Sequence, residues 1–172
     1  PAEAIVSDPT GAVVRKLDSA WRVAMPDALV ETYPKKIVLT PGFDNCIRGY
    51  GIKHYESFER VLSGLDPNDP DEADYIRFFR ALATTVTLDS SNRFRISDAL
   101  MGWLGVDDDK RELMVFDAGE YFEVWETGRW NQFMSERATE LKDLARRIFG
   151  KKQGRQEEER EHGAGTCAGN GH

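Results

Sequence analysis

One short phrase occurs twice in the chain, and this repeat constrains the fold more than any other feature. The first copy, KLDSAWRVAMPDAL, runs from Lys16 to Leu29, and the second, TLDSSNRFRISDAL, runs from Thr87 to Leu100. In both copies Leu-Asp-Ser is followed by an arginine, an alternating apolar and polar run, and Asp-Ala-Leu. An internal repeat of this kind indicates two copies of one supersecondary unit that share a core.

The similarity between the copies continues downstream of the phrase. Residues 36–50, KIVLTPGFDNCIRGY, predict two strands around a glycine-containing turn, and residues 112–126, ELMVFDAGEYFEVWE, follow the same plan. Each pair of strands runs into a segment with apolar residues at helical spacing, such as Ile52, Tyr55 and Phe58. Each copy is therefore predicted to contain a strand, a short helical turn, two further strands and a helix.

The repeat also divides the chain into segments. We predict an N-terminal segment with a possible short strand at 1–12, a first unit at 13–65, a connecting helix at 66–83, a second unit at 84–136, a C-terminal helix at 137–150 and a disordered tail at 151–172. The tail is rich in glycine and charge and has almost no apolar residues, which is typical of disorder.

The composition allows a core without covalent staples. Of the 172 residues, 40% are hydrophobic, and nine Phe, four Trp and five Tyr are among them. The two cysteines, Cys46 and Cys167, lie in very different contexts, so we expect no structural disulfide and a reducing, cytoplasmic location. Cys46 is expected to be a buried, inert thiol. No apolar run reaches the length of a membrane span and no signal peptide is evident, so no membrane partner is expected.

The charge pattern is more informative than the net charge. A formal charge of −7 argues against nucleic acid as a partner when taken alone, because phosphate binding needs clustered Lys and Arg. Basic residues nevertheless gather around the repeated phrase: Arg15, Lys16 and Arg22 in the first copy, and Arg93 and Arg95 in the second. The acidic residues concentrate elsewhere, in runs that are expected to be solvated loops and helix caps.

Taken together, these segments resemble the MraZ family, which belongs to the SpoVT/AbrB-like swapped-hairpin superfamily. The family pattern Leu-Asp-x-x-Gly-Arg, an alternating strand and Ile-Pro is approached by LDSAWRVAMP and LDSSNRFRIS. The family segment Val-Leu-Thr-x-Gly-x-Asp-x-Cys-Leu is matched by IVLTPGFDNCIRGY, and its Phe-Glu-Ile-Trp with a Trp-bearing helix is matched by FEVWETGRWNQF. The resemblance covers roughly residues 13–136.

This resemblance implies both a fold and a function. The implied fold is mainly β with helices (α+β), in which two tandem AbrB-like swapped-hairpin units supply each other's missing strands and form one pseudo-symmetric β-barrel module with outer helices. The implied function is a sequence-specific transcriptional regulator, expected to be a repressor, of the division and cell-wall gene cluster. The implied partners are double-stranded DNA with short direct repeats in a promoter and further copies of the chain in a homo-oligomeric ring, in the cytoplasm at the nucleoid.

The resemblance places the DNA-facing surface on the β-layer that carries the repeated motifs. Arg22 and Arg93 are therefore candidate DNA-binding residues, because a planar guanidinium suits both phosphates and base edges. A second set flanks the motifs on strands, where a solvated strand face explains them equally well: Arg15, Lys16 and Arg95. Asp18 and Asp89 are expected to be structural and to hold the loops through ion pairs with the arginines.

No catalytic residue is predicted, because the sequence shows no nucleophile and base arrangement, no Gly-rich phosphate loop and no carboxylate pair. We expect no enzyme activity, no metal, no cofactor and no small-molecule substrate. His162, Cys167 and His172 in the tail do not have the spacing of a structural zinc site.

One departure from the family pattern concerns the glycine before each arginine, which is Trp21 in the first copy and Asn92 in the second. Asn tolerates the left-handed backbone conformation that such a glycine adopts, whereas Trp does not adopt it cheaply, so the first loop is expected to differ in shape. This difference and the acidic net charge leave a second hypothesis open, an oligomeric scaffold that binds protein instead of DNA. An AbrB-type antitoxin is a third and weaker hypothesis, because such proteins usually carry one short unit.

Overall fold

The structure is a computed structural model that describes residues 11–150 of the chain. The predictions for residues 1–10 and for the tail at 151–172 lie outside these described residues. By their contacts the residues form one compact unit up to Trp130 and a second from Asn131 onward. The second unit is helical in its described part, with the end of α5 (Thr127–Ala138) and a helix over 141–150.

Within residues 11–150, each repeat contributes four strands. The elements of the first repeat are β1 (Val13–Lys16), β2 (Arg22–Ala24), α1 (Asp27–Thr32), β3 (Lys36–Pro41), the 3₁₀ turn η1 (Phe43–Asn45), β4 (Ile47–Gly51) and α2 (Ile52–Ser63). After α3 (Pro70–Leu82), the second repeat follows with β5 (Thr84–Thr87), β6 (Arg93–Arg95), α4 (Asp98–Leu104), β7 (Glu112–Asp117), β8 (Phe122–Glu126) and α5. The predicted order lacks β1 and β5, which are separate four-residue strands before each Leu-Asp-Ser.

The strands of the two repeats interleave. Six of them form an antiparallel sheet in the order β1-β7-β8-β4-β3-β5, and β2 and β6 form a separate two-stranded ribbon. The first strand of each repeat joins the hairpin of the other, since β1 pairs with β7 and β5 pairs with β3. The predicted fold class is therefore confirmed: an α+β fold of two tandem units that exchange strands. The turns that carry Leu-Asp-Ser connect the sheet to the ribbon.

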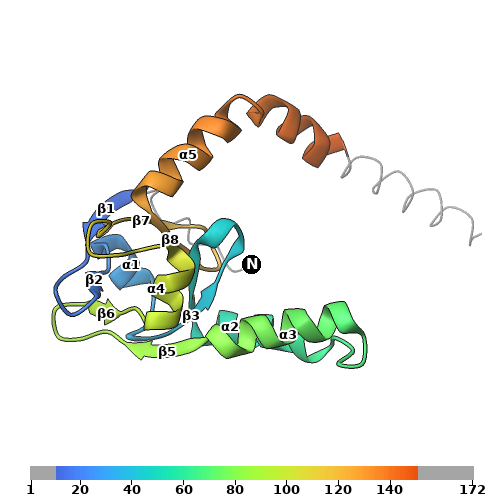
Figure 1. Cartoon of the computed structure of the whole chain (residues 1–172), viewed down its shortest axis with the longest axis horizontal. Coiled ribbons are helices and arrows are strands. Elements are labelled where there is room, and N and C mark those ends of the chain that lie inside the picture. The colour runs from blue at the N-terminus through green and yellow to red at the C-terminus, as the bar shows by residue number, and fades with distance from the viewer. Residues whose placement is uncertain (1–10, 151–172) are drawn as a thin grey trace, which may run out of the picture. The chain divides into compact units, whose positions relative to one another are not determined.

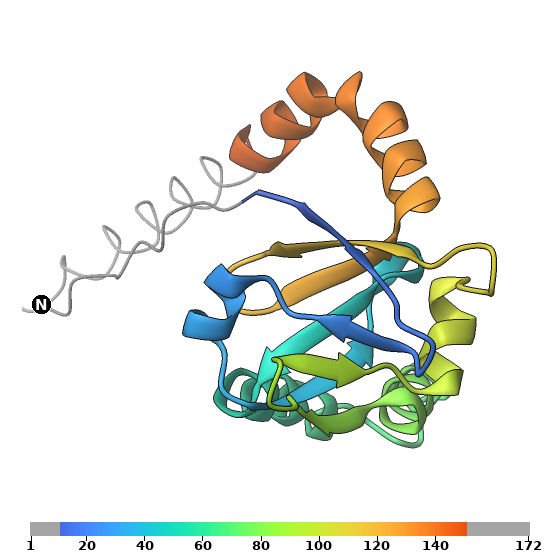
Figure 2. The ribbon, with the colours of Figure 1, turned by 90° about the vertical axis from the view of Figure 1, so that its left-hand side faces the viewer.

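Both repeats contribute side chains to a single core, which includes residues of the sheet and of the ribbon. Figures 1 and 2 show how these elements are arranged in the backbone. The ribbon supplies Val23 and Phe94, the sheet supplies Phe122 among others, and the short helices α1 and α4 supply Leu29 and Leu100. These five side chains are at most 1% exposed. Because the apolar residues of each repeat pack against those of the other, neither repeat can bury its own core alone.

The helices α2 and α3 lie side by side at the edge that carries β3 and β5 (Figure 1). Aromatic rings join them to the sheet: Phe58 of α2 stacks on Tyr50 of β4 at 5.7 Å and meets Phe79 of α3 edge-on at 5.3 Å. The N-terminus of α3 is capped by Asp69, whose carboxylate accepts two backbone hydrogen bonds, and proline follows at the first helical position.

Three further observations concern the buried thiol, possible metal sites and the lengths of the helices. Cys46 is buried, as predicted, and burial raises the pKa of its thiol to about 12, so the thiol stays protonated and inert near neutral pH. Across residues 11–150 no three His, Cys, Asp or Glu residues gather as a possible metal site. In the same range no helix is long and apolar enough to cross a membrane.

Candidate functional site

The two-stranded ribbon of β2 and β6 presents the arginines of the repeated motifs. Val23 and Phe94 pair across the ribbon and point into the core. Because side chains alternate along a strand, the residues on either side of them face outward. Arg22 lies directly opposite Arg95, and Arg93 lies opposite Ala24. The ribbon therefore brings three of the five predicted DNA-binding residues onto one outer face, which is turned toward the viewer in Figure 2.

The motif aspartates and arginines of the two repeats form one network. Nε of Arg22 lies 2.9 Å from Oδ2 of Asp18, and Nε of Arg93 lies 3.0 Å from Oδ2 of Asp89. Each arginine also approaches the aspartate of the other repeat through Nη1, at 3.8 Å for Arg22 and 3.5 Å for Arg93. The four side chains are 29–38% exposed, so the guanidinium groups are held in a fixed orientation and remain accessible to a ligand.

The second carboxylate oxygen of each aspartate shapes the loop. Oδ1 of Asp18 accepts hydrogen bonds from the backbone N–H groups of Ala20 and Arg22, at 2.8 and 3.0 Å. Oδ1 of Asp89 accepts the two matching bonds in the second loop, both at 2.9 Å. Each aspartate thus fixes its loop with one oxygen and orients an arginine with the other.

These contacts lower the pKa of both aspartates. The largest cause for Asp18 is the hydrogen bond from the backbone N–H of Arg22, and the largest cause for Asp89 is the bond from the backbone N–H of Arg93. Partial burial opposes the shift, and the arginine guanidinium groups add to it. Both carboxylates are therefore ionised at neutral pH, as the network requires.

A pH dependence of stability follows from these lowered pKa values. The contribution of the two carboxylates is fully present above the unfolded-state pKa, about 3.9, and is lost as the pH falls from there through the lower folded-state pKa. We expect Asp18→Asn/Asp89→Asn to be less stable than the wild type at pH 7 and to approach it below about pH 4. Urea unfolding of both proteins between pH 7 and pH 3 measures the difference in their free energies of unfolding, and the titration of all other groups cancels in this difference. A difference that does not change with pH would show that the network is not formed in solution.

The structure overturns the expectation that the first loop differs in shape from the second. Trp21 has φ of 57° and Asn92 has φ of 54°, so both residues adopt the left-handed conformation. The backbone bonds also match: Trp21 N–H donates to the carbonyl of Asp18 at 3.1 Å, and Asn92 N–H donates to that of Asp89 at 2.9 Å. Both loops present their arginine in the same way.

The side chain of Trp21 offsets the strain of its backbone. A left-handed conformation costs a residue other than glycine roughly 1–2 kcal/mol. The indole packs against the core, and the guanidinium carbon of Arg111 lies 4.3 Å from its ring centroid, a contact of about 0.5–1 kcal/mol. Arg111 also donates from Nη1 to the carbonyl of Asp18 at 3.0 Å. Sequence reasoning missed Arg111, because it follows an acidic run outside the repeated phrase.

Two substitutions of Trp21 separate strain from packing. Trp21→Ala and Trp21→Gly both lose the indole contacts, but only glycine relieves the left-handed strain. We therefore expect Trp21→Gly to be more stable than Trp21→Ala by about 1 kcal/mol in urea unfolding, although both are less stable than the wild type. The same comparison at Asn92 is the control, with a gap of the same sign. An absent gap at Trp21 would mean that the first loop has another backbone conformation in solution.

The remaining predicted residues lie elsewhere or are more exposed. Arg15 and Lys16 are adjacent on β1, so they point to opposite faces of the six-stranded sheet and are not on the ribbon. Nη1 of Arg15 donates to the carbonyl of Val14 at 3.1 Å. Arg95 is on the ribbon, is 57% exposed and meets Asp98 at 3.1 Å. The roles of these residues in binding remain predictions.

The outer face of the ribbon is not strongly basic in formal charge. Three arginines are balanced by three aspartates that contact them: Arg22, Arg93 and Arg95 against Asp18, Asp89 and Asp98. A guanidinium has five N–H donors, and the shortest contact of each motif arginine uses Nε. The ribbon therefore presents oriented hydrogen-bond donors in place of a broad positive field.

Comparison with known proteins gives matches over both repeats. A family model described as "MraZ protein, putative antitoxin-like" matches residues 10–78 and again residues 79–152. A protein named transcriptional regulator MraZ from Acetivibrio thermocellus is 26% identical over 138 residues, which are 80% of this chain and 94% of the relative. Proteins of the same name from Lactiplantibacillus plantarum and Clavibacter michiganensis are 28% and 27% identical over 133 and 134 residues. These alignments cover 77% and 78% of this chain and 92% of each relative.

Proposed function

The chain belongs to the MraZ family, whose model it matches in both repeats, and from this premise we propose that it is a sequence-specific DNA-binding transcriptional regulator. The relatives that bear the name transcriptional regulator support this proposal. In its finer form, the protein represses the division and cell-wall gene cluster. It acts in the cytoplasm at the nucleoid as a ring-shaped homo-oligomer that binds short direct repeats.

The ribbon of β2 and β6 is the observation that carries the proposal. The major groove of DNA accommodates a two-stranded antiparallel ribbon, and arginine pairs with guanine edges there. Arg22 and Arg93 are pre-oriented by carboxylates, so little side-chain entropy is lost when a base edge or phosphate binds. Arg95, opposite Arg22, adds a third and more exposed contact.

The ribbon also favours DNA sites arranged as direct repeats over palindromic DNA sites. A two-fold symmetric ribbon would present the same side chains to both half-sites and would favour a palindrome. Here the position of Arg95 in the second repeat corresponds to Ala24 in the first, so the two ends of the outer face carry different side chains. Such an asymmetric module reads its DNA site in one orientation, and several identical modules then require sites that repeat in tandem.

A ring explains how a module with few basic residues can bind tightly. Once one module is bound, its neighbours meet the adjacent repeats at a high effective concentration, so the overall affinity exceeds that of a single module. Because many phosphates are neutralised together, binding should weaken steeply with salt.

A second candidate function is an oligomeric scaffold that binds protein. The observation in its favour is that the three arginines of the ribbon are balanced by three neighbouring aspartates. A scaffold would use the same face for polar contacts with another protein and would not need DNA.

Fluorescence anisotropy decides between the two functions. The probe is a duplex with the direct repeats found upstream of the protein's own gene, and the controls are a scrambled duplex and one in which alternate repeats are inverted, each at two salt concentrations. We expect salt-sensitive binding that prefers the direct repeats. Folded, oligomeric protein that binds none of the duplexes at low salt would exclude the regulator and leave the scaffold. Equal affinity for the inverted duplex would contradict the directional ribbon.

A further inference from the structure

The hairpin of β3 and β4 carries an exposed aromatic side chain at its turn. Phe43 is 57% exposed, and the next residue, Asp44, is also exposed. Asp44 and Asn45 both have φ of 59°, the left-handed conformation that Asp and Asn adopt more readily than most other residues, so the turn has a defined shape.

The surrounding structure holds this turn rigidly. Nδ2 of Asn45 donates to the carbonyl of Trp103 on α4 at 3.1 Å, and Nε1 of Trp103 donates to the carbonyl of Cys46 at 2.8 Å. The backbone N–H of Gly42 closes the turn on the carbonyl of Cys46 at 2.8 Å. Phe43 is therefore presented on a preorganised support, which reduces the entropy cost of binding.

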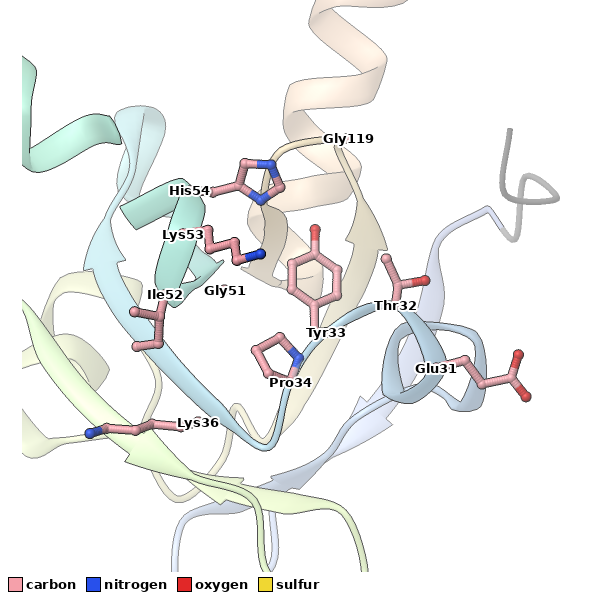
Figure 3. A pocket seen from close by; sticks show the side chains of 10 residues that line it. All are labelled: Glu31, Thr32, Tyr33, Pro34, Lys36, Gly51, Ile52, Lys53, His54 and Gly119. Carbon is pink, nitrogen blue, oxygen red and sulfur yellow. The ribbon is translucent and has the colours of Figure 1, made fainter. Parts of the chain in front are cut away.

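A cavity of about 560 Å³ lies at the other end of the same hairpin. Its walls are mainly apolar and include Tyr33, Pro34 and Ile52 (Figure 3). The ring of Tyr33 is fixed in place by its hydroxyl, which donates to Oδ1 of Asp117 at 3.2 Å. The cavity is large enough for an aromatic side chain and part of the turn that bears it.

The charges around the cavity complement those of the turn. The amino group of Lys53 and the ring of His54 lie beside Tyr33, whereas the carboxylate of Glu31 points away from the cavity (Figure 3). An aromatic ring flanked by a carboxylate matches such a site, and Phe43 followed by Asp44 has this chemistry.

Phe43 cannot enter the cavity of its own molecule. The cavity lies at the end of the hairpin where Ile37 pairs with Gly51, and Phe43 lies beyond the opposite end, where Pro41 pairs with Ile47. A six-residue strand separates the two ends by about 20 Å. Any such contact must therefore join two molecules, and it joins different surfaces of each, which generates a ring or a filament.

We propose that the turn at Phe43 and Asp44 of one copy docks into the cavity at Tyr33, Ile52 and Lys53 of the next copy. This inference rests on the homo-oligomer of the proposed function and names the surfaces that join its subunits. Phe43 supplies the apolar anchor of the contact, and Asp44 pairs with Lys53 across it.

Two variants that each remove one side of the contact test this inference. Phe43→Asp removes the anchor, and Thr32→Trp fills the cavity from an exposed position on its wall. We expect wild-type protein to sediment as an oligomer larger than a dimer and each variant to sediment as a monomer. An equimolar mixture should form dimers only, because one variant keeps an intact cavity and the other an intact turn.

The controls separate this inference from folding defects and from the proposed function. Val61→Asp makes the same kind of change at another exposed apolar residue, on α2, and should leave the oligomer intact. Lys53→Glu, at an exposed position, should weaken self-association about tenfold, and circular dichroism checks that every variant is folded. If the Phe43→Asp and Lys53→Glu variants both sediment like the wild type, the docking proposal is overturned, but the proposed ring-shaped oligomer is not. Wild-type protein that is monomeric would overturn both, while the anisotropy experiment still decides whether it binds DNA.

Discussion

Gly49→Ala should destabilise the protein more than any other single methyl addition to the sheet. Gly49 lies on the core face of β4, and a Cβ atom there would meet the ring of Phe122 at 2.0 Å from Cζ. Phe122 is fully buried and cannot move away without displacing Phe94 and Tyr33, whose rings it contacts. We expect a loss of about 3 kcal/mol in the free energy of unfolding, the upper end for an overpacked core.

A second glycine gives the matched control for this substitution. Gly102 lies within α4, where an added Cβ would meet no atom within 4 Å. Gly102→Ala should therefore raise stability by about 0.5–1 kcal/mol, because alanine favours the helix. Urea unfolding of the two variants and the wild type measures both effects. A Gly49→Ala protein as stable as the wild type would contradict the packing of Phe122 over β4.

Arg22→Ala/Arg93→Ala should abolish specific DNA binding while leaving the fold intact. Each arginine is expected to contribute roughly 1–3 kcal/mol through base or phosphate contacts, so removing the pair should lower the affinity at least about 30-fold. The cost in stability is expected to be small, because partly exposed ion pairs contribute about 0–1 kcal/mol each. Anisotropy with the direct-repeat duplex measures the loss, and urea unfolding checks the fold.

Two other arginines make this experiment specific. Arg77 and Arg146 are each paired with an aspartate three residues earlier, lie away from the ribbon in sequence and are well exposed. Arg77→Ala/Arg146→Ala changes the net charge equally, so it should retain nearly all specific affinity. If both double variants lose affinity to the same extent, the effect is one of net charge, and the ribbon is not the binding surface.

Much of the fold could be predicted because each element of the repeated unit is marked by residues close together in the sequence. The Leu-Asp-Ser phrase, the glycine-containing hairpins and the periodic helices each have short-range signals, and both copies show them. The strands β1 and β5 were missed because four residues give too short an alternation. The pairing of β1 with β7 joins residues far apart in the chain and was not predicted; the resemblance to a swapped-hairpin family implied only that the two units exchange strands.

The site was predictable in part for the same reason. The motif arginines and aspartates were found through their repetition, but their association across the two repeats depends on the pairing of β2 with β6. The conformation of Trp21 was predicted wrongly, because its stabilising partner Arg111 lies in a loop distant in sequence. Arg15 and Lys16 were grouped with Arg22 by proximity in sequence, although adjacent residues on a strand face opposite ways.

The exchange of strands between the repeats has a consequence for how the chain folds as it is synthesised. When the first repeat leaves the ribosome, β1 has no partner until β7 is made, and β3 lacks β5 on one side. The central pairing of β4 with β8 closes only when residue 126 has emerged. The first half must therefore wait with an open hydrophobic surface, and the chain commits to its native state late, almost all at once. A nascent chain that stalls before β7 would expose that surface and become a substrate for chaperones or proteases.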